Sequence, residues 1–138
     1  MKKVTLFLIA AFCLSVAACS KDAEVNAFIA EFDSTTKEMI SKIDANPSAE
    51  GIDSAQKAFD GKKASLKAKF DAIKDAVGFQ VGSDTKKNLE DTVKKDMNDL
   101  LSVTMKHAET IGSDAEASQK FQKLMTDLQN LFPDPNAK

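Results

Sequence analysis

Apolar residues recur every three or four positions along most of this 138-residue chain, and this period limits the fold more than any other feature. The first stripe runs from Val25 to Ile43, positions 18 residues apart, or about five turns at 3.6 residues per turn. It predicts an amphipathic helix over residues 22–44. Asn46 and Pro47 should end this helix, because a residue that precedes proline is pushed out of the helical region.

Three further stripes follow along the chain. The second, residues 52–77, should bend or loosen near Gly61, because Lys62 and Lys63 stand where an apolar turn is due. Gly78 is a natural stop for that helix.

The third stripe predicts one helix from about Ser83 to Ile111. The fourth predicts a helix over residues 117–131, which Ser113 and Glu116 would begin as a capping box. Four amphipathic helices with short connections favour an all-α, four-helix, up-down-up-down bundle. The alternative is a long helical hairpin with two shorter packed helices.

If the second and third helices form a hairpin that turns near residues 80–81, their facing residues can be paired. Lys62 and Lys63 then lie opposite residues 98–99, with Asp96 about a turn away. This register predicts that the lysine stems cover the core while their ammonium groups reach Asp96 and Asp99.

Residues 1–18 have the composition of an export signal. Two lysines precede an apolar run from Val4 to Val16, about thirteen residues, which is too short for the roughly 20 residues that a membrane-spanning helix needs. Small residues then lead to a cysteine, in the order Val16-Ala17-Ala18-Cys19.

This junction resembles the lipobox of bacterial lipoproteins. The resemblance implies that residues 1–18 are removed and that Cys19 carries the acyl chains that bind the membrane. Ser20 at the next position implies the periplasmic face of the outer membrane, if the bacterium has two membranes. Residues 19–132 would form the anchored domain and residues 133–138 a disordered tail.

The composition of the chain argues against nucleic-acid binding. The chain from Cys19 onwards holds 17 lysines and 21 acids, with no arginine, tryptophan or tyrosine. Nucleic-acid recognition favours arginine forks and stacking aromatics, so we expect no nucleic-acid partner. Lysines concentrate in residues 57–95, where they would help the helices choose neighbours or bind anionic lipid.

No arrangement of residues specifies a reaction, so the chain is predicted not to be an enzyme and to hold no cofactor. The alternative is a haem- or metal-binding carrier that uses the single histidine, His107, with a methionine. The methionines at 39, 97, 105 and 125 fall on or beside apolar stripes, which favours packing.

Phe79 and Val81 are apolar side chains on a turn between Gly78 and Gly82. They would either cover the end of the core or form an exposed contact for a partner. The sequence therefore predicts a lipid-anchored envelope protein with a non-enzymatic, protein-binding or structural role and a partner of unknown identity.

Overall fold

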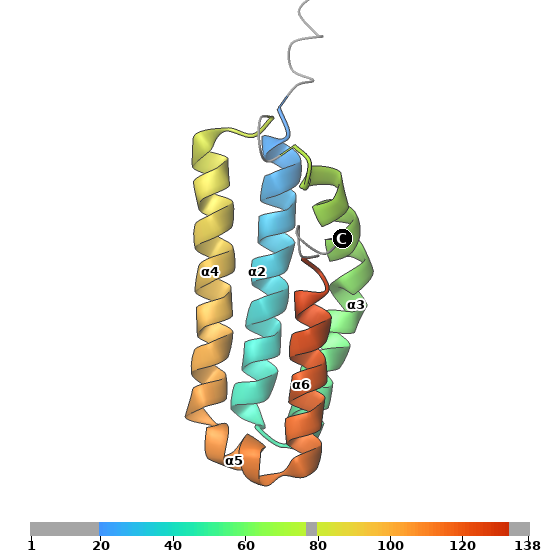
Figure 1. Ribbon diagram of the computed structural model, residues 1–138, viewed down its shortest axis with the longest axis vertical. Coiled ribbons are helices and arrows are strands. Elements are labelled where there is room, and N and C mark those ends of the chain that lie inside the picture. The colour runs from blue at the N-terminus through green and yellow to red at the C-terminus, as the bar shows by residue number, and fades with distance from the viewer. Residues whose placement is uncertain (1–19, 77–79, 133–138) are drawn as a thin grey trace, which may run out of the picture.

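The predicted stripes form helices in the computed structural model, which describes residues 20–76 and 80–132 (Figure 1). The helices are α2 (Asp22–Ala45), α3 (Ala49–Ile73), α4 (Ser83–Lys106), α5 (Ala108–Ser113) and α6 (Ala115–Gln129). The four long helices alternate in direction, which confirms the all-α up-down-up-down bundle. None of the described helices is long and apolar enough to cross a membrane.

The turn between α2 and α3 is tight. Asn46 adopts an extended conformation before Pro47, as expected for a residue that precedes proline. The backbone of Asn46 then passes so close to Gly51 that a Cβ atom there would lie 1.7 Å from the Asn46 carbonyl oxygen. Glycine is therefore required at position 51 by the close approach of two backbone segments.

Helix α3 runs through Gly61 without interruption, so the expected loosening does not break the helix. It ends at Ile73, short of the predicted Val77. Val77 and Gly78, the predicted stop, lie outside the described residues.

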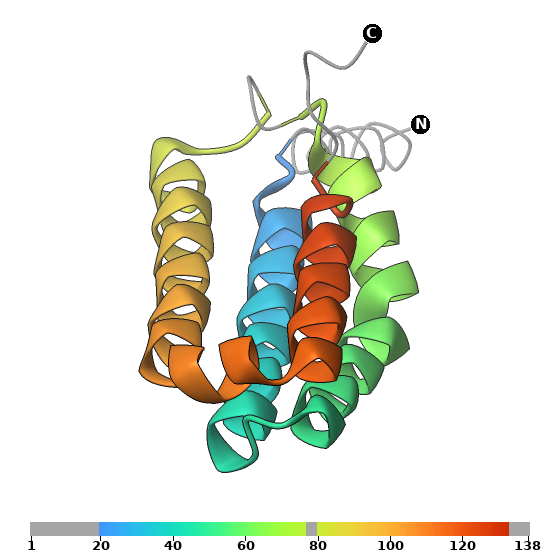
Figure 2. The ribbon, with the colours of Figure 1, turned by 60° about the horizontal axis from the view of Figure 1, so that its bottom comes forward.

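Two predicted helix boundaries are wrong. The third helix does not continue to Ile111, because α4 ends at Lys106 and the chain turns at His107 into the short α5. That turn lets α5 cross the end of the bundle from α4 to α6 (Figure 2). Helix α6 is capped by Asp114 and not by Ser113, since the Asp114 carboxylate accepts hydrogen bonds from two backbone N–H groups at 2.9 and 3.1 Å.

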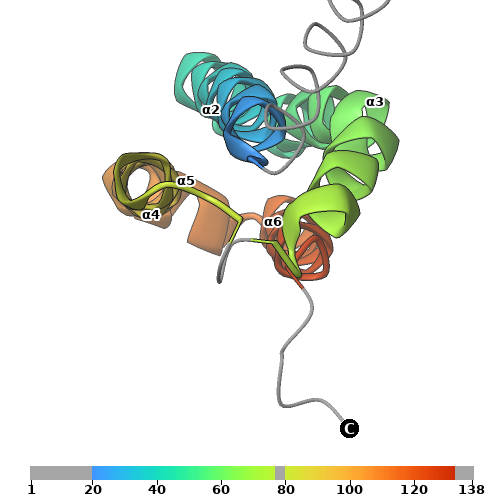
Figure 3. The ribbon, with the colours of Figure 1, turned by 90° about the horizontal axis from the view of Figure 1, so that it is seen from above.

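The predicted hairpin of the second and third helices is also wrong. Within the described ranges, α3 and α4 do not pack along their lengths; α4 packs on α2 and α6 packs on α3. Seen from above, the order around the bundle is α4, α2, α3, α6, and α5 joins the two ends of this arc (Figure 3). Helix α4 therefore runs parallel to α2, on the side of α2 away from α3.

The ion pairs follow this order and not the hairpin. The Lys63 ammonium binds Asp127 of α6 at 3.0 Å, and Lys95 binds Asp99 within α4 at 2.6 Å. The predicted contact of Lys62 and Lys63 with the acids of α4 therefore does not form.

Apolar residues of α2, α3 and α6 fill the core. At the end where α2 begins, the rings of Phe28, Phe32, Phe70 and Phe132 pack with centroids 5.2–6.2 Å apart. Such aromatic contacts add to the free energy gained by burying the rings. They fasten the segment just after α6 to the start of α2 and the end of α3.

Helix α4 is the least buried of the long helices. Three of its residues, Asp96, Leu100 and Val103, are buried, against eight residues of α2. Leu89, Val93 and Met97 are only partly buried against the core. The contact between α4 and α2 therefore buries few side chains of α4, and one of these is the carboxyl group of Asp96.

Candidate functional site

Two of the predicted site residues, Cys19 and Phe79, lie outside the described residues. The third, Val81, is 7% exposed and belongs to the hydrophobic core. Of the two roles considered for Val81, the structure agrees with covering the end of the core.

The chain joins the bundle directly after position 19. The Lys21 N–H donates to the Gln80 carbonyl oxygen at 2.9 Å, and α2 begins at the next residue. The Ser20 hydroxyl donates to the Asp22 carboxylate at 2.6 Å. No stretch of free chain therefore separates the described bundle from residue 19.

The surroundings of His107 do not suit a metal or haem ligand. Its Nε2 atom lies 2.8 Å from Oδ1 of Asp44, and the Lys106 ammonium lies 2.6 Å from the same oxygen. An ammonium group at that carboxylate repels a cation. Across residues 20–76 and 80–132, no three His, Cys, Asp or Glu side chains gather in a group that could hold a metal ion.

Three aspartates of α2 follow the contact with α4 at intervals of 11 residues, and we call Asp22, Asp33 and Asp44 the aspartate ladder. Eleven residues make about three helical turns, so the three side chains lie on one face of α2. Each aspartate lies beside the residue 63 positions later in the chain, within α4 or directly after it. The three partners are Thr85, Asp96 and His107, in that order. The constant offset shows that α2 and α4 pack in parallel and in register.

The outer members of the aspartate ladder accept hydrogen bonds. At one end, Asp22 accepts from the Gly82 N–H at 2.9 Å and from the Thr85 side chain. At the other end, Asp44 contacts Lys106 and His107. Hydrogen bonds from Ser20 and Gly82 lower the pKa of Asp22, and those from Lys106 and His107 lower the pKa of Asp44.

The middle member is different, because Asp33 meets another carboxyl group. Asp96 is 1% exposed and lies within hydrogen-bonding reach of Asp33. Its Oδ2 atom has no hydrogen-bond partner among the described residues. Burial raises the pKa of Asp96 to about 6, and the charge of Asp33 adds to this rise while Lys95 opposes it.

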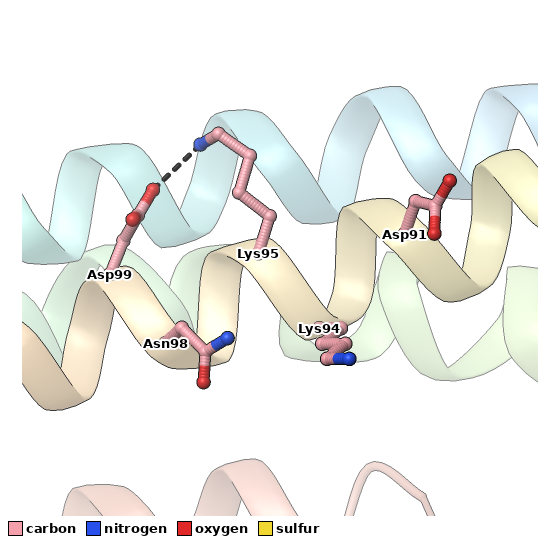
Figure 4. A pocket seen from close by; sticks show the side chains of 5 residues that line it. All are labelled: Asp91, Lys94, Lys95, Asn98 and Asp99. Atoms are coloured by element: carbon pink, nitrogen blue, oxygen red, sulfur yellow. Dashed lines mark hydrogen bonds and ion pairs between the residues drawn. The ribbon is translucent and has the colours of Figure 1, made fainter.

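The outward face of α4 is a charged, solvated surface with a shallow hollow (Figure 4). The Lys95 ammonium binds the Asp99 carboxylate at 2.6 Å. Figure 4 shows this pair, with Lys94 and Asn98 pointing away from it. Paired charges of this kind supply no converging catalytic groups. Beside them on α4, Leu101 and Met105 are 57% and 69% exposed, the large apolar side chains that the described surface leaves most open.

A second polar cluster joins α3 to α6. The Asp127 carboxylate of α6 accepts from Lys63 at 3.0 Å, from Lys123 at 2.7 Å and from the Gln56 amide at 3.0 Å. Lys123 and Lys63 lower the pKa of Asp127 to about 2. Lys63 belongs to the basic segment 57–95, so this contact agrees with the expectation that those lysines help the helices choose neighbours.

Sequence reasoning missed the aspartate ladder, although two signals were available. The 11-residue spacing of Asp22, Asp33 and Asp44 is visible in the sequence. In α4 the stripe of positions 89, 93, 96, 100 and 103 has the regular spacing 4, 3, 4, 3 and includes Asp96. A carboxyl group at a core position is the stronger signal, because such a group is rarely buried without a partner.

Comparison with known proteins adds no family assignment. No protein-family model matches the chain, and neither the curated proteins nor the solved structures contain a match.

Proposed function

We propose that this protein is a lipid-anchored component of the bacterial envelope with a non-enzymatic role, and that it binds a partner protein near the membrane surface. The observation that carries this proposal is the pair Leu101 and Met105, exposed on a helix whose outward face is otherwise charged. Exposed apolar side chains rimmed by polar residues mark many protein interaction sites.

The anchor would fix the height of this surface above the membrane. Lys21 is bonded to the bundle two residues after Cys19, so acyl chains on Cys19 would hold that end of the bundle against the bilayer. Helix α4 starts at the same end and runs away from it (Figure 1). At about 1.5 Å per residue, Leu101 lies roughly 27 Å along α4 from Ser83. The proposed partner is therefore contacted about that far from the lipid headgroups.

The alternative of a haem- or metal-binding carrier has less support. His107, on which it depends, is engaged with Asp44 beside the Lys106 ammonium.

The test is photo-crosslinking in native membranes. A photoreactive amino acid replaces Leu101 or Met105 in the anchored protein, and the control places it at Lys57, an exposed position of α3. A discrete protein adduct from positions 101 and 105, absent from position 57, is the expected result. Equal adducts from all three positions, or adducts to lipid alone, would contradict a partner at this surface.

A further inference from the structure

We propose that a proton shared between Asp33 and Asp96 holds α4 against α2, so that α4 separates from α2 more readily as the pH rises. The inference rests on the α2–α4 contact and does not depend on the proposed anchor or partner.

The unpartnered oxygen of Asp96 is the first support. With both carboxyl groups ionised, neither can donate a hydrogen bond, and the buried Oδ2 atom of Asp96 has no donor among the described residues. A buried polar atom without a partner is costly. One proton on Asp96 removes that cost, because the protonated carboxyl group then donates to Asp33.

The lysines around Asp33 and Asp96 do not take the place of the shared proton. From α2, Asp33 faces Asp96 and is itself bound by Lys37 at 2.7 Å. From α4, the Lys95 ammonium lies 3.9 Å from Oδ1 of Asp96, but it is bound to Asp99 at 2.6 Å. Both lysines are thus engaged with other carboxylates, and neither lies within hydrogen-bonding distance of Asp96.

The position of α4 explains why this helix can separate from α2 while the rest of the bundle stays folded. Helix α4 packs along α2, it has three buried residues, and one of these is Asp96 itself. The remaining core of α2, α3 and α6 includes Phe28, Phe59 and Leu124, each 0% exposed. Loosening α4 would therefore leave most of the buried apolar side chains in contact.

The direction of the pH effect follows from the two states of Asp96. Its pKa is about 6 when α4 is docked and returns toward the ordinary 3.8 when the side chain is exposed. Docking is therefore favoured fully below pH 3.8, and this advantage is lost as the pH rises through 6. The outer members of the aspartate ladder act oppositely, since their lowered pKa values favour docking above the ordinary value. The contact should therefore be tightest near pH 4 and should loosen as the pH rises from there through 6.

Native-state hydrogen exchange of the full chain in detergent micelles tests this inference. Exchange is read by mass spectrometry at pH 5 and 7.5 and corrected for the intrinsic effect of pH on amide exchange. In peptides of α4, the opening constant should rise about tenfold between the two pH values. Peptides of α3 should show no such rise.

Two variants assign the effect to the carboxyl pair. In Asp96→Asn the side chain is neutral at both pH values, so the tenfold rise should disappear. In Asp33→Asn the new amide donates to an ionised Asp96, so α4 should open less at pH 7.5 than in the wild type. Asp91→Asn is the matched control, because Asp91 is a 64% exposed carboxylate of the same helix, and its variant should keep the full rise.

Three results would overturn the inference. The first is an opening constant of α4 that does not change with pH in the wild type. The second is an equal rise in α2, α3, α4 and α6, which would mean that the whole bundle opens. The third is an unchanged pH response in either Asp96→Asn or Asp33→Asn.

Discussion

At the scale of single residues, two glycines of α3 show how far the effect of a substitution depends on the surrounding backbone. Gly51 and Gly61 both lie in α3, yet their surroundings are opposite. A Cβ atom at Gly51 would meet the Asn46 backbone, whereas nothing lies within 4 Å of a Cβ atom at Gly61. The same substitution should therefore change stability in opposite directions at the two positions.

Gly51→Ala should lower the free energy of unfolding by about 1–3 kcal/mol or more, because the new Cβ atom would overlap the Asn46 backbone, which must then shift. Gly61→Ala should raise it by about 0.5–1 kcal/mol, through the helix preference of alanine. Urea unfolding followed by circular dichroism measures both. A stabilised Gly51→Ala variant would show that the α2–α3 turn is not packed as described.

Asp127 should make the joint between α3 and α6 sensitive to acid. Its pKa is lowered to about 2, so its stabilising contribution is present above 3.8 and is lost as the pH falls through 2. Because the two lysines are 40% and 63% exposed, solvent screening reduces this contribution to about 1–2 kcal/mol.

The variant Asp127→Asn should therefore be less stable than the wild type by that amount at pH 7, and the difference should shrink between pH 4 and 2. Urea unfolding at each pH measures it, with Asp91→Asn as the exposed control that changes stability by less than about 0.5 kcal/mol. A difference between Asp127→Asn and the wild type that does not vary with pH would contradict the ion-pair account.

At the scale of the helices, α4 differs from its neighbours in how it is held. Its contact with α2 combines a few apolar side chains with the aspartate ladder of Asp22, Asp33 and Asp44. Two adjacent leucines show how narrow the apolar contact is, because Leu100 is 0% exposed and Leu101 is 57% exposed.

Leu100→Ala should cost about 2–4 kcal/mol, since it removes a fully buried side chain and leaves a cavity. Leu101→Ala should change the free energy of unfolding by less than about 0.5 kcal/mol. Thermal and urea unfolding of the two variants provide the measurement. Equal losses would mean that α4 is rotated relative to the arrangement described here.

The sequence predicted the four long helices, but not the short α5 or the neighbours of each helix. The stripe from Val25 to Ile43 predicts α2 to within a residue, because burial on one face of a helix leaves a 3.6-residue period. The position of α4 could not be predicted in the same way. A hairpin was assumed from the closeness of α3 and α4 in sequence, whereas α4 packs on α2 and not along α3.

The polar contacts were harder to predict than the apolar ones. Asp96 was expected to pair with a lysine of the second helix, and only the packing of α4 on α2 shows that it is buried beside Asp33 instead. The cap at Asp114 was missed by one residue, since Ser113 fits the same capping pattern. Such contacts depend on the rotation of each helix about its own axis. The apolar period defines that rotation too coarsely to say which of two adjacent polar residues makes the contact.

On the scale of the whole molecule, the described bundle has two distinct ends. At one end Lys21, two residues after Cys19, is bonded to the link before α4, and the phenylalanine cluster closes the core. At the other end α5 and the Asp44–His107 contact close the bundle. An anchor on Cys19 would orient this axis away from the membrane and present the far half of α4 to a partner.

The most direct measurement of the central claim follows Cys19 itself. Cells that produce the full chain are labelled with a fatty-acid analogue and fractionated, with Cys19→Ser as the variant and Ser20→Ala as the control for a change at the neighbouring position. We expect the wild type and Ser20→Ala to take up the label and sediment with membranes, and Cys19→Ser to do neither. A wild-type protein without label, together with a Cys19→Ser variant that still sediments with membranes, would contradict the account.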